Sequence, residues 1–73
     1  MILSNLSPGK TGIIEDILLE EQQGDRLSEL GFSRNTSVEM IRNKGPNIVV
    51  RIRGFIFALQ REICNKILIY RSF

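Results

Sequence analysis

The sequence predicts a small, mainly β domain in which five short strands form a barrel, with one short helix. Three observations lead to this prediction. Apolar and polar residues alternate in several short segments, which is the period of a half-buried strand. Glycine and proline turn signals separate these segments at short intervals. An open sheet in a chain of 73 residues would leave long exposed edges, which a closed or nearly closed sheet avoids.

The length and the cysteine content limit the class of protein. We expect one domain, residues 1–73, because two hydrophobic cores would not fit in so short a chain. The single cysteine, Cys64, cannot form an internal disulfide, which favours a reducing, cytoplasmic compartment. We find no secretion-signal pattern at the start and no apolar run near the ~20 residues of a membrane helix. The expected location is therefore the cytoplasm.

The first strand follows an early turn. Pro8-Gly9 predicts that turn, because proline presets φ and glycine supplies a positive φ. The isoleucine-rich segment 11–18 predicts the strand. The polar segment 20–24 is expected to interrupt regular structure before the helix.

The helix is predicted at about residues 25–30. Asp25 suits its first turn or N-cap, and Leu27 and Leu30, three residues apart, are expected to face the core. Gly31 stands where a left-handed residue would end the helix.

The second half of the chain predicts four strands. Val38 and Met40 share one face of the second strand, which ends at the turn signal 44–47. In the third strand, residues 48, 50 and 52 are apolar and share a face. The fourth strand spans 56–61, and a helical turn at 61–66 precedes a fifth strand at 67–70.

The hairpin between the third and fourth strands is expected to turn at Gly54-Phe55. If residue 53 pairs with residue 56, Ile52 faces Phe57 and Val50 faces Leu59 on one buried side. Glycine at the first central position is typical of a type II′ turn. Five strands of this kind favour a barrel of the SH3-like or OB type.

The chemistry of the sequence argues against catalysis. The chain has no histidine, and this removes the commonest general base and the commonest transition-metal ligand. Cys64 lacks a histidine that would activate it and is expected to be a buried or half-buried structural thiol. We therefore predict a non-enzymatic binding protein with no catalytic residue, no metal ligand and no cofactor.

Two other classes of function remain as alternatives. The acidic residues Glu15, Asp16, Glu20 and Glu21 offer hard oxygen ligands, which suit Mg²⁺ or Mn²⁺, so direct binding of a metal ion is one of them. Residues 34–73 hold eight basic and two acidic residues, which raises single-strand nucleic-acid binding as the other. The aromatic residues are too few for stacking to favour it, and we expect no nucleic-acid partner.

A partner-binding surface is predicted on the outward side of the second to fourth strands. Val49 and Ile56 face outward when Val50 and Ile52 face the core, and Ile41 joins them if Met40 points inward. Neighbouring exposed apolar residues beside basic ones resemble a protein-binding patch. The predicted partner-binding residues are Ile41, Val49, Arg51, Arg53 and Ile56.

Five segments, taken in order, carry a family resemblance. They are Leu6-x-x-Gly9-x-x-Gly12-x-Ile14, Arg26-Leu27-x-Glu29-Leu30-Gly31-Phe32, Val38 with the Gly45-Pro46 turn, Val50-x-Ile52-x-Gly54-x-x-Phe57-Ala58-Leu59-x-Arg61, and Ile67-x-Ile69. Together they cover most of the chain and resemble the FeoA family, the cytosolic accessory proteins of bacterial ferrous iron uptake.

The resemblance implies an SH3-like barrel without enzymatic activity. It implies a role beside FeoB, a membrane transporter with a GTP-hydrolysing cytosolic part, so that any membrane association would run through that transporter. The same type of domain occurs fused to iron-dependent repressors. With iron uptake implied, direct binding or sensing of Fe²⁺ through the acidic segment is the alternative function. Two positions depart from the family: asparagine stands at Asn35 where glycine is usual, and the loop between the second and third strands is short.

Overall fold

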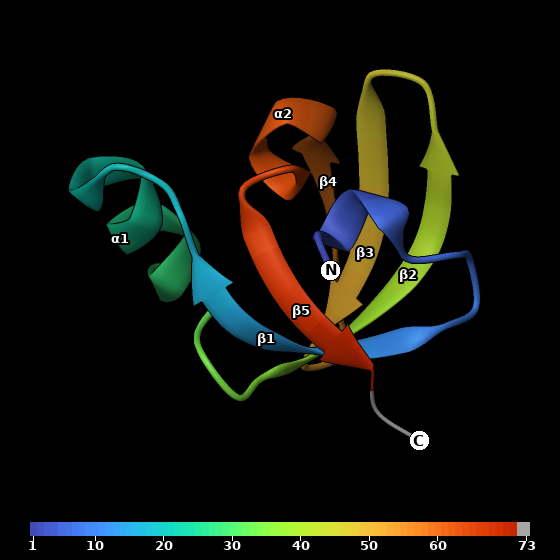
Figure 1. Cartoon of the computed structure of the whole chain (residues 1–73), viewed down its shortest axis with the longest axis horizontal. Coiled ribbons are helices and arrows are strands. Elements are labelled where there is room, and N and C mark those ends of the chain that lie inside the picture. Colours follow the sequence, from blue (N-terminus) through green and yellow to red (C-terminus); the bar gives the residue numbers. More distant parts are fainter. Residues whose placement is uncertain (72–73) are drawn as a thin grey trace.

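The strands form one antiparallel sheet in the order β4-β3-β2-β1-β5 (Figure 1). The computed structural model describes residues 1–71, and the predicted five-stranded, mainly β architecture is confirmed. Within this part of the chain, no helix is long and apolar enough to span a membrane. The elements in order are η1 (Leu3–Asn5), β1 (Thr11–Ile17), α1 (Glu21–Glu29), β2 (Ser37–Lys44), β3 (Asn47–Ile52), β4 (Phe55–Gln60), α2 (Arg61–Cys64) and β5 (Ile67–Arg71).

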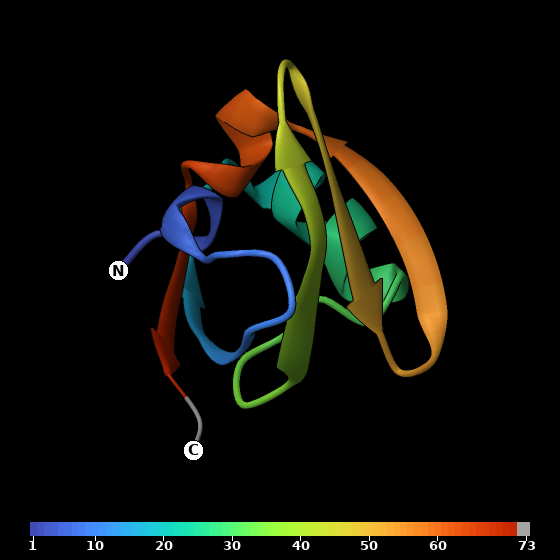
Figure 2. The same cartoon turned by 90° about the vertical axis from the view of Figure 1, so that its right-hand side faces the viewer.

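The sheet curves strongly, so that its two outermost strands are linked by the short helix α2 (Figures 1 and 2). The 3₁₀ helix η1 lies against α2 and β5, while α1 projects to one side of the barrel (Figure 1). Of the residues of α1, only Leu27 is buried. The helix is therefore attached to the core mainly through one side chain.

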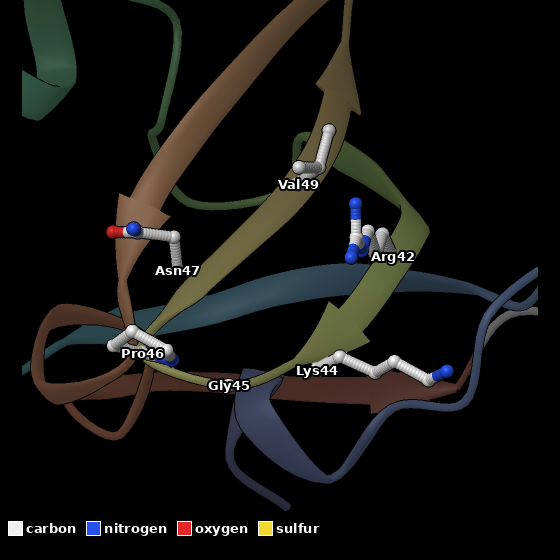
Figure 3. Close-up of a pocket in the computed structure, with 6 residues that line it drawn as sticks. All are labelled: Arg42, Lys44, Gly45, Pro46, Asn47 and Val49. Atoms are coloured by element: carbon white, nitrogen blue, oxygen red, sulfur yellow. The ribbon is translucent and has the colours of Figure 1, made fainter.

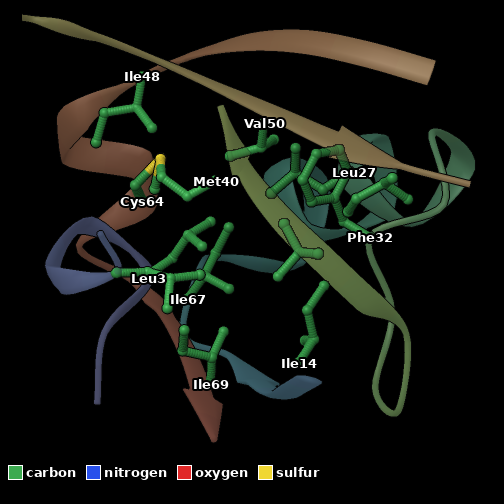
Figure 4. Close-up of a cluster of buried hydrophobic side chains, with 13 residues drawn as sticks. Leu3, Ile14, Leu27, Phe32, Met40, Ile48, Val50, Cys64, Ile67 and Ile69 are labelled. Carbon is green, nitrogen blue, oxygen red and sulfur yellow. The ribbon is translucent and has the colours of Figure 1, made fainter. Parts of the chain in front are cut away.

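The core fills the inside of the curved sheet (Figure 4). Strand β3 shows the alternation that the sequence predicted, since its three apolar inward residues are fully or almost fully buried. The rings of Phe32 and Phe57 meet edge to face, with centroids 5.4 Å apart. The buried apolar residues are Leu3, Leu6, Ile14, Leu27, Phe32, Val38, Met40, Ile48, Val50, Ile52, Cys64, Ile67 and Ile69.

The turn between β3 and β4 lies one residue earlier than the sequence predicted. Ile52 pairs with Phe55, so Arg53 and Gly54 are the two turn residues. Both have positive φ, 52° and 85°, which matches a type I′ turn and not the predicted type II′. The predicted buried face is nevertheless retained. Moving the turn by one residue changes the partner of each β3 residue by two positions, and residues two apart in a strand share a face. Val50 now faces Phe57, and Ile48 faces Leu59.

A turn of the type II′ pattern instead connects β2 to β3. Lys44 pairs with Asn47 across Gly45-Pro46, and Gly45 has a φ of 66°. Proline follows it with its fixed negative φ, which suits the second central position. The short connection expected between these strands is confirmed.

Helix α1 begins earlier than predicted. It starts at Glu21 after the extended N-cap residue Glu20, and the N–H of Gly24 already donates to the Glu20 carbonyl at 2.9 Å. The prediction of an interruption at 20–24 was wrong, because Glu21, Gln22 and Gln23 have good helix propensity and one glycine weakens the helix by only about 1 kcal/mol. Their polarity reflects exposure of the helix to solvent.

The end of α1 confirms one expectation and corrects another. Gly31 has a φ of 104°, and its N–H donates to Ser28 while the N–H of Phe32 donates to Leu27, as in a Schellman motif. Leu30, expected to face the core, is 48% exposed. It occupies the C-cap position, where the chain turns away, and Phe32 packs inward in its place. Asn35 has the left-handed φ of 69° that glycine would supply in the family.

Candidate partner-binding face

The outward side of β2, β3 and β4 forms three rows of neighbouring side chains. In the first row, Arg51 lies between Glu39 and Ile56, and in the second, Val49 lies between Arg42 and Ala58. The third row contains Lys44, Asn47 and Gln60. We call the following set the outer face: Glu39, Ile41, Arg42, Lys44, Asn47, Val49, Arg51, Ile56, Ala58 and Gln60.

A β-bulge in β2 decides which residues join this face. Met40 pairs with Val50 and Arg42 pairs with Val49, so Ile41 is the extra residue. Simple alternation after Met40 would turn Arg42 inward and Asn43 outward. The bulge reverses this, and the side chain of Asn43 donates inward to the carbonyls of Ser4 and Leu6 at 2.8 and 3.0 Å.

The apolar part of the outer face consists of Ile41, Val49 and Ile56. Ile56 is 59% exposed, while Ile41 and Val49 are half-buried. None of the three is among the apolar side chains packed on the core cluster. The structure thus brings together four of the five predicted partner-binding residues, these three and Arg51.

The charged residues of the outer face have different partners. The Nη1 of Arg51 donates to the Oε1 of Glu39 at 2.9 Å, across adjacent strands. Both side chains are well exposed, so this pair contributes little to stability. Arg42 and Lys44 form no ion pair with any residue in the described range 1–71. Their positive charge remains available to a partner.

A hollow of about 340 Å³ adjoins Val49 at the β2–β3 turn (Figure 3). Arg42 and Lys44 extend along one side of it, and Val49 and Pro46 supply apolar contact. Sequence reasoning did not assign Arg42 and Lys44 to the face because the bulge that turns them outward has no sequence signal strong enough to locate it. Their closeness to the Gly45-Pro46 turn was the available clue.

Arg53 lies apart from the other predicted residues. It occupies the β3–β4 turn, where strand alternation has ended. A methyl group built on Gly31 would lie 3.6 Å from the Cδ of Arg53, so the arginine side chain packs beside the end of α1. The structure therefore places Arg53 near the helix terminus and away from the apolar strip of the outer face.

The acidic residues considered as metal ligands do not converge. The carboxylate of Asp16 accepts from the backbone N–H of Ile17 and pairs with Arg34 at 3.2 Å. These two contacts, the backbone bond first, lower the pKa of Asp16. Residues 1–71 contain no group of three or more histidine, cysteine, aspartate or glutamate side chains placed to hold a metal ion. Cys64 is fully buried, as predicted.

Comparison with known proteins gives one family and several similar structures. A model described as the FeoA domain matches residues 1–71. The structure resembles a crystal structure described as iron uptake regulatory protein (FeoA), with a TM-score of 0.91 and 19% identity, over 99% of this chain and 97% of that one. A search of curated proteins gave no significant match.

Two further structures show where else this fold occurs. The FeoA of Stenotrophomonas maltophilia, complexed with zinc, is described as an SH3 domain protein and a candidate ferrous iron transport activating factor. It matches with a TM-score of 0.82 and 24% identity, over 94% of this chain and 88% of that one. A manganese-dependent transcriptional repressor matches with a TM-score of 0.86 and 17% identity, over 99% of this chain and 41% of the repressor. The predicted SH3-like fold is confirmed.

Proposed function

Because the chain belongs to the FeoA family, we propose that it binds and modulates a FeoB-type ferrous iron transporter. The family domain is a non-enzymatic accessory associated with ferrous iron transport. In this proposal the partner is the cytosolic part of the transporter, and the contact surface is the outer face. The observation that supports it most is the strip Ile41–Val49–Ile56 beside two cations without ion-pair partners in residues 1–71.

The composition of the outer face suits a protein partner. Protein interfaces combine an apolar centre with a polar rim, and the strip has Arg42 and Lys44 on one side and the Arg51–Glu39 pair on the other. The strands also hold these side chains on a rigid sheet, which keeps the loss of conformational entropy on binding small. The exposed cations favour a partner surface with acidic residues, and they would steer its approach.

Modulation in this proposal acts through binding alone. The chain contains no histidine, and Cys64 is buried, so no activated nucleophile is available. A bound protein shifts a conformational equilibrium by the difference between its affinities for the two states. The accessory domain would therefore alter transport by binding one state of the transporter more tightly than another.

The test is binding of the Val49→Asp variant to the purified cytosolic part of the transporter, measured by calorimetry. Placing a carboxylate in the middle of the strip is expected to raise Kd at least tenfold, about 1.4 kcal/mol, because the charge loses water without gaining a partner. Leu18→Asp is the matched control, since Leu18 is 54% exposed and lies outside the outer face. Circular dichroism of both variants verifies that the fold is retained.

Two results would overturn the proposal. Equal affinity of Val49→Asp and wild type would exclude the outer face. If the wild type does not bind the transporter fragment but binds Fe²⁺ saturably under anaerobic conditions, direct iron handling replaces the proposed function. Loss of that Fe²⁺ binding in the double variant Glu20→Gln/Glu21→Gln would then locate it in the acidic segment.

A further inference from the structure

The two edge strands of the sheet, β5 and β4, differ in whether another segment of the chain is hydrogen-bonded to them. The edge of β5 is covered by the N-terminal residues: the Met1 ammonium donates to the Ile69 carbonyl at 3.0 Å, and the Ile69 N–H donates to the Met1 carbonyl at 2.7 Å. Ile2 adds a bridge to Leu68. Strand β4, at the other edge, pairs with β3 alone among the described strands. It runs along the outer margin of the molecule on the right of Figure 2.

The hairpin geometry identifies which backbone groups of β4 point away from β3. In a two-residue hairpin the pair that flanks the turn, here Ile52 and Phe55, exchanges hydrogen bonds. Alternation then directs the N–H and C=O groups of Ile56, Ala58 and Gln60 to the free edge. As the N-cap residue of α2, Gln60 gives its carbonyl to the first turn of that helix, so its N–H is the group it offers at the edge.

This edge lacks the features that usually prevent strands from pairing. Proteins protect free edges with charged residues, proline or bulges. Strand β4 contains none of these, since its residues are Phe55, Ile56, Phe57, Ala58, Leu59 and Gln60, and its register with β3 is continuous. Phe55 and Ile56 are 68% and 59% exposed. The edge is therefore regular in register, apolar and free of the residues that would prevent pairing with another strand.

We propose that two copies of this chain pair through β4, in antiparallel orientation about a two-fold axis, to form one continuous ten-stranded sheet. Only the backbone groups that point away from β3 can form hydrogen bonds between the copies, and this requirement determines the register. Ala58 lies opposite Ala58 of the second copy, and Ile56 lies opposite Gln60. Two hydrogen bonds form between the alanines, and one forms from each Gln60 N–H to an Ile56 carbonyl, which gives four bonds in total.

The side chains of β4 are compatible with this self-pairing. The residue on the axis is alanine, whose small side chain lets the strands approach without a clash. On the inward side, Phe57 of each copy lies opposite Leu59 of the other, and both are partly buried apolar residues that pack on the core. On the outward side, Ile56 lies opposite the uncharged Gln60. No like charges meet within the paired segment.

Charges at the ends of β4 favour a second copy of this chain as the partner that pairs with its free edge. Antiparallel pairing brings the start of β4 in one copy near the start of α2 in the other. Arg53 precedes β4, the exposed Glu62 follows it, and neither forms an ion pair within residues 1–71. Arg61 is held elsewhere, because it donates to the Gly45 carbonyl and to Asn43 at 2.8 and 2.9 Å. The two-fold axis thus places Arg53 near Glu62 twice, as an isologous interface requires.

The proposed pairing uses three residues of the outer face, Ile56, Ala58 and Gln60, but the evidence for it does not depend on the function proposed above. These residues form the margin of the outer face, and pairing along their free backbone edge leaves Ile41, Val49 and the hollow uncovered. Contact along one strand is small, so the dimer is expected to be weak and to depend on concentration. Sedimentation velocity of the full chain from 10 µM to 1 mM should show the mass rising from 8.4 kDa towards twice that value.

A charge swap at the axis tests the proposed register. Ala58→Lys and Ala58→Glu place like charges opposite each other, and each variant alone should raise the dimer Kd at least tenfold. An equimolar mixture of the two should recover the dimer, because opposite charges then meet across the axis. Leu18→Lys, at an exposed position away from β4, should dimerise like the wild type. A purely structural defect at residue 58 would not be rescued by mixing.

Cross-linking gives a second measure. Hydrogen-bonded partners in antiparallel strands lie about 5.5 Å apart between Cα atoms, within the range of a disulfide. Ala58→Cys should form a dimer on mild oxidation, whereas Gln60→Cys should not, because the two Gln60 residues lie several positions apart. The native Cys64 is buried and will not compete. A wild type that stays at 8.4 kDa at 1 mM, or Gln60→Cys cross-linking faster than Ala58→Cys, would overturn the proposal.

Discussion

Burial controls the chemistry of Cys64. Its side chain is fully enclosed by the core at the end of α2. Removal from water disfavours the thiolate and raises the pKa of Cys64 to about 11, against a smaller opposing effect of the nearby Arg61. The thiol is therefore neutral and unreactive in the folded protein at neutral pH. Its role is to fill space beside the apolar residues of the core.

This pKa predicts a specific loss of stability in alkali. The unfolded thiol ionises near pH 9 and the folded thiol near pH 11, so the unfolded state gains stability as the pH rises through this window. Below pH 9 the thiol is neutral in both states, and the stabilising contribution of the buried Cys64 is fully present. Urea denaturation from pH 8 to 10.5 should show wild type losing about 1–2 kcal/mol relative to Cys64→Ala. Parallel pH profiles of the two proteins would contradict the prediction.

Helix α1 is well defined although it packs very little apolar surface against the core. It buries only Leu27, and its residues are otherwise polar or exposed. Its end is nevertheless well defined, because the Schellman bonds at Gly31 and the inward turn of Phe32 fix the exit of the chain. The buried side chain of Leu27 and the hydrogen bonds at the C-terminal end together hold the helix in place.

Two glycine substitutions in and after α1 should act in opposite directions. Gly24→Ala is expected to stabilise the protein by about 0.5–1 kcal/mol, because no atom lies within 4 Å of an added methyl group and alanine favours the helix. Gly31→Ala is expected to destabilise it by about 1–2 kcal/mol, since its φ is 104° and the methyl group would lie 3.3 Å from Ile52. Urea titration of both variants measures the difference. A stabilising Gly31→Ala would show that the left-handed C-cap is not required.

At the scale of the whole molecule, Asn43 connects three separate segments. Its Nδ2 donates to the carbonyls of Ser4 and Leu6, and its Oδ1 accepts from the Nη2 of Arg61 at 2.9 Å. The hydroxyl of Ser4 in turn donates to the side chain of Asn65. The N-terminal segment, β2 and the region of α2 are thereby joined at one end of the barrel.

Replacement of Asn43 should destabilise the hydrogen-bonded contact between the N-terminal segment, β2 and the region of α2. Asn43→Ala removes partners from two partly buried carbonyls and is expected to lower the free energy of unfolding by about 2–3 kcal/mol. Asn43→Asp keeps the acceptor for Arg61 but loses both donors, so it should also destabilise the protein. Chemical denaturation measures both variants, and hydrogen exchange at residues 2–6 shows where the loss occurs. A change below about 0.5 kcal/mol in Asn43→Ala would contradict this role.

The outer face shows the limit of sequence reasoning at a single position. Alternation placed Val49 and Ile56 outward correctly, because residues two apart in a regular strand share a face. It could not place Arg42 and Lys44, since the bulge at Ile41 depends on how β2 fits against β3. The same alternation assigned Arg53 to the outer face, but the turn begins at that residue and redirects its side chain.

The sequence by itself determined the five strands, the buried faces of β2 and β3, the glycine that ends α1 and the family. These features follow from local periodicity and from residues with special backbone freedom, and both can be read from neighbours in the chain. The tertiary structure alone decided the turn at Arg53-Gly54, the bulge in β2 and the unprotected edge of β4. Each of these depends on which distant segment supplies a hydrogen bond or a packing surface, and no local pattern records that choice.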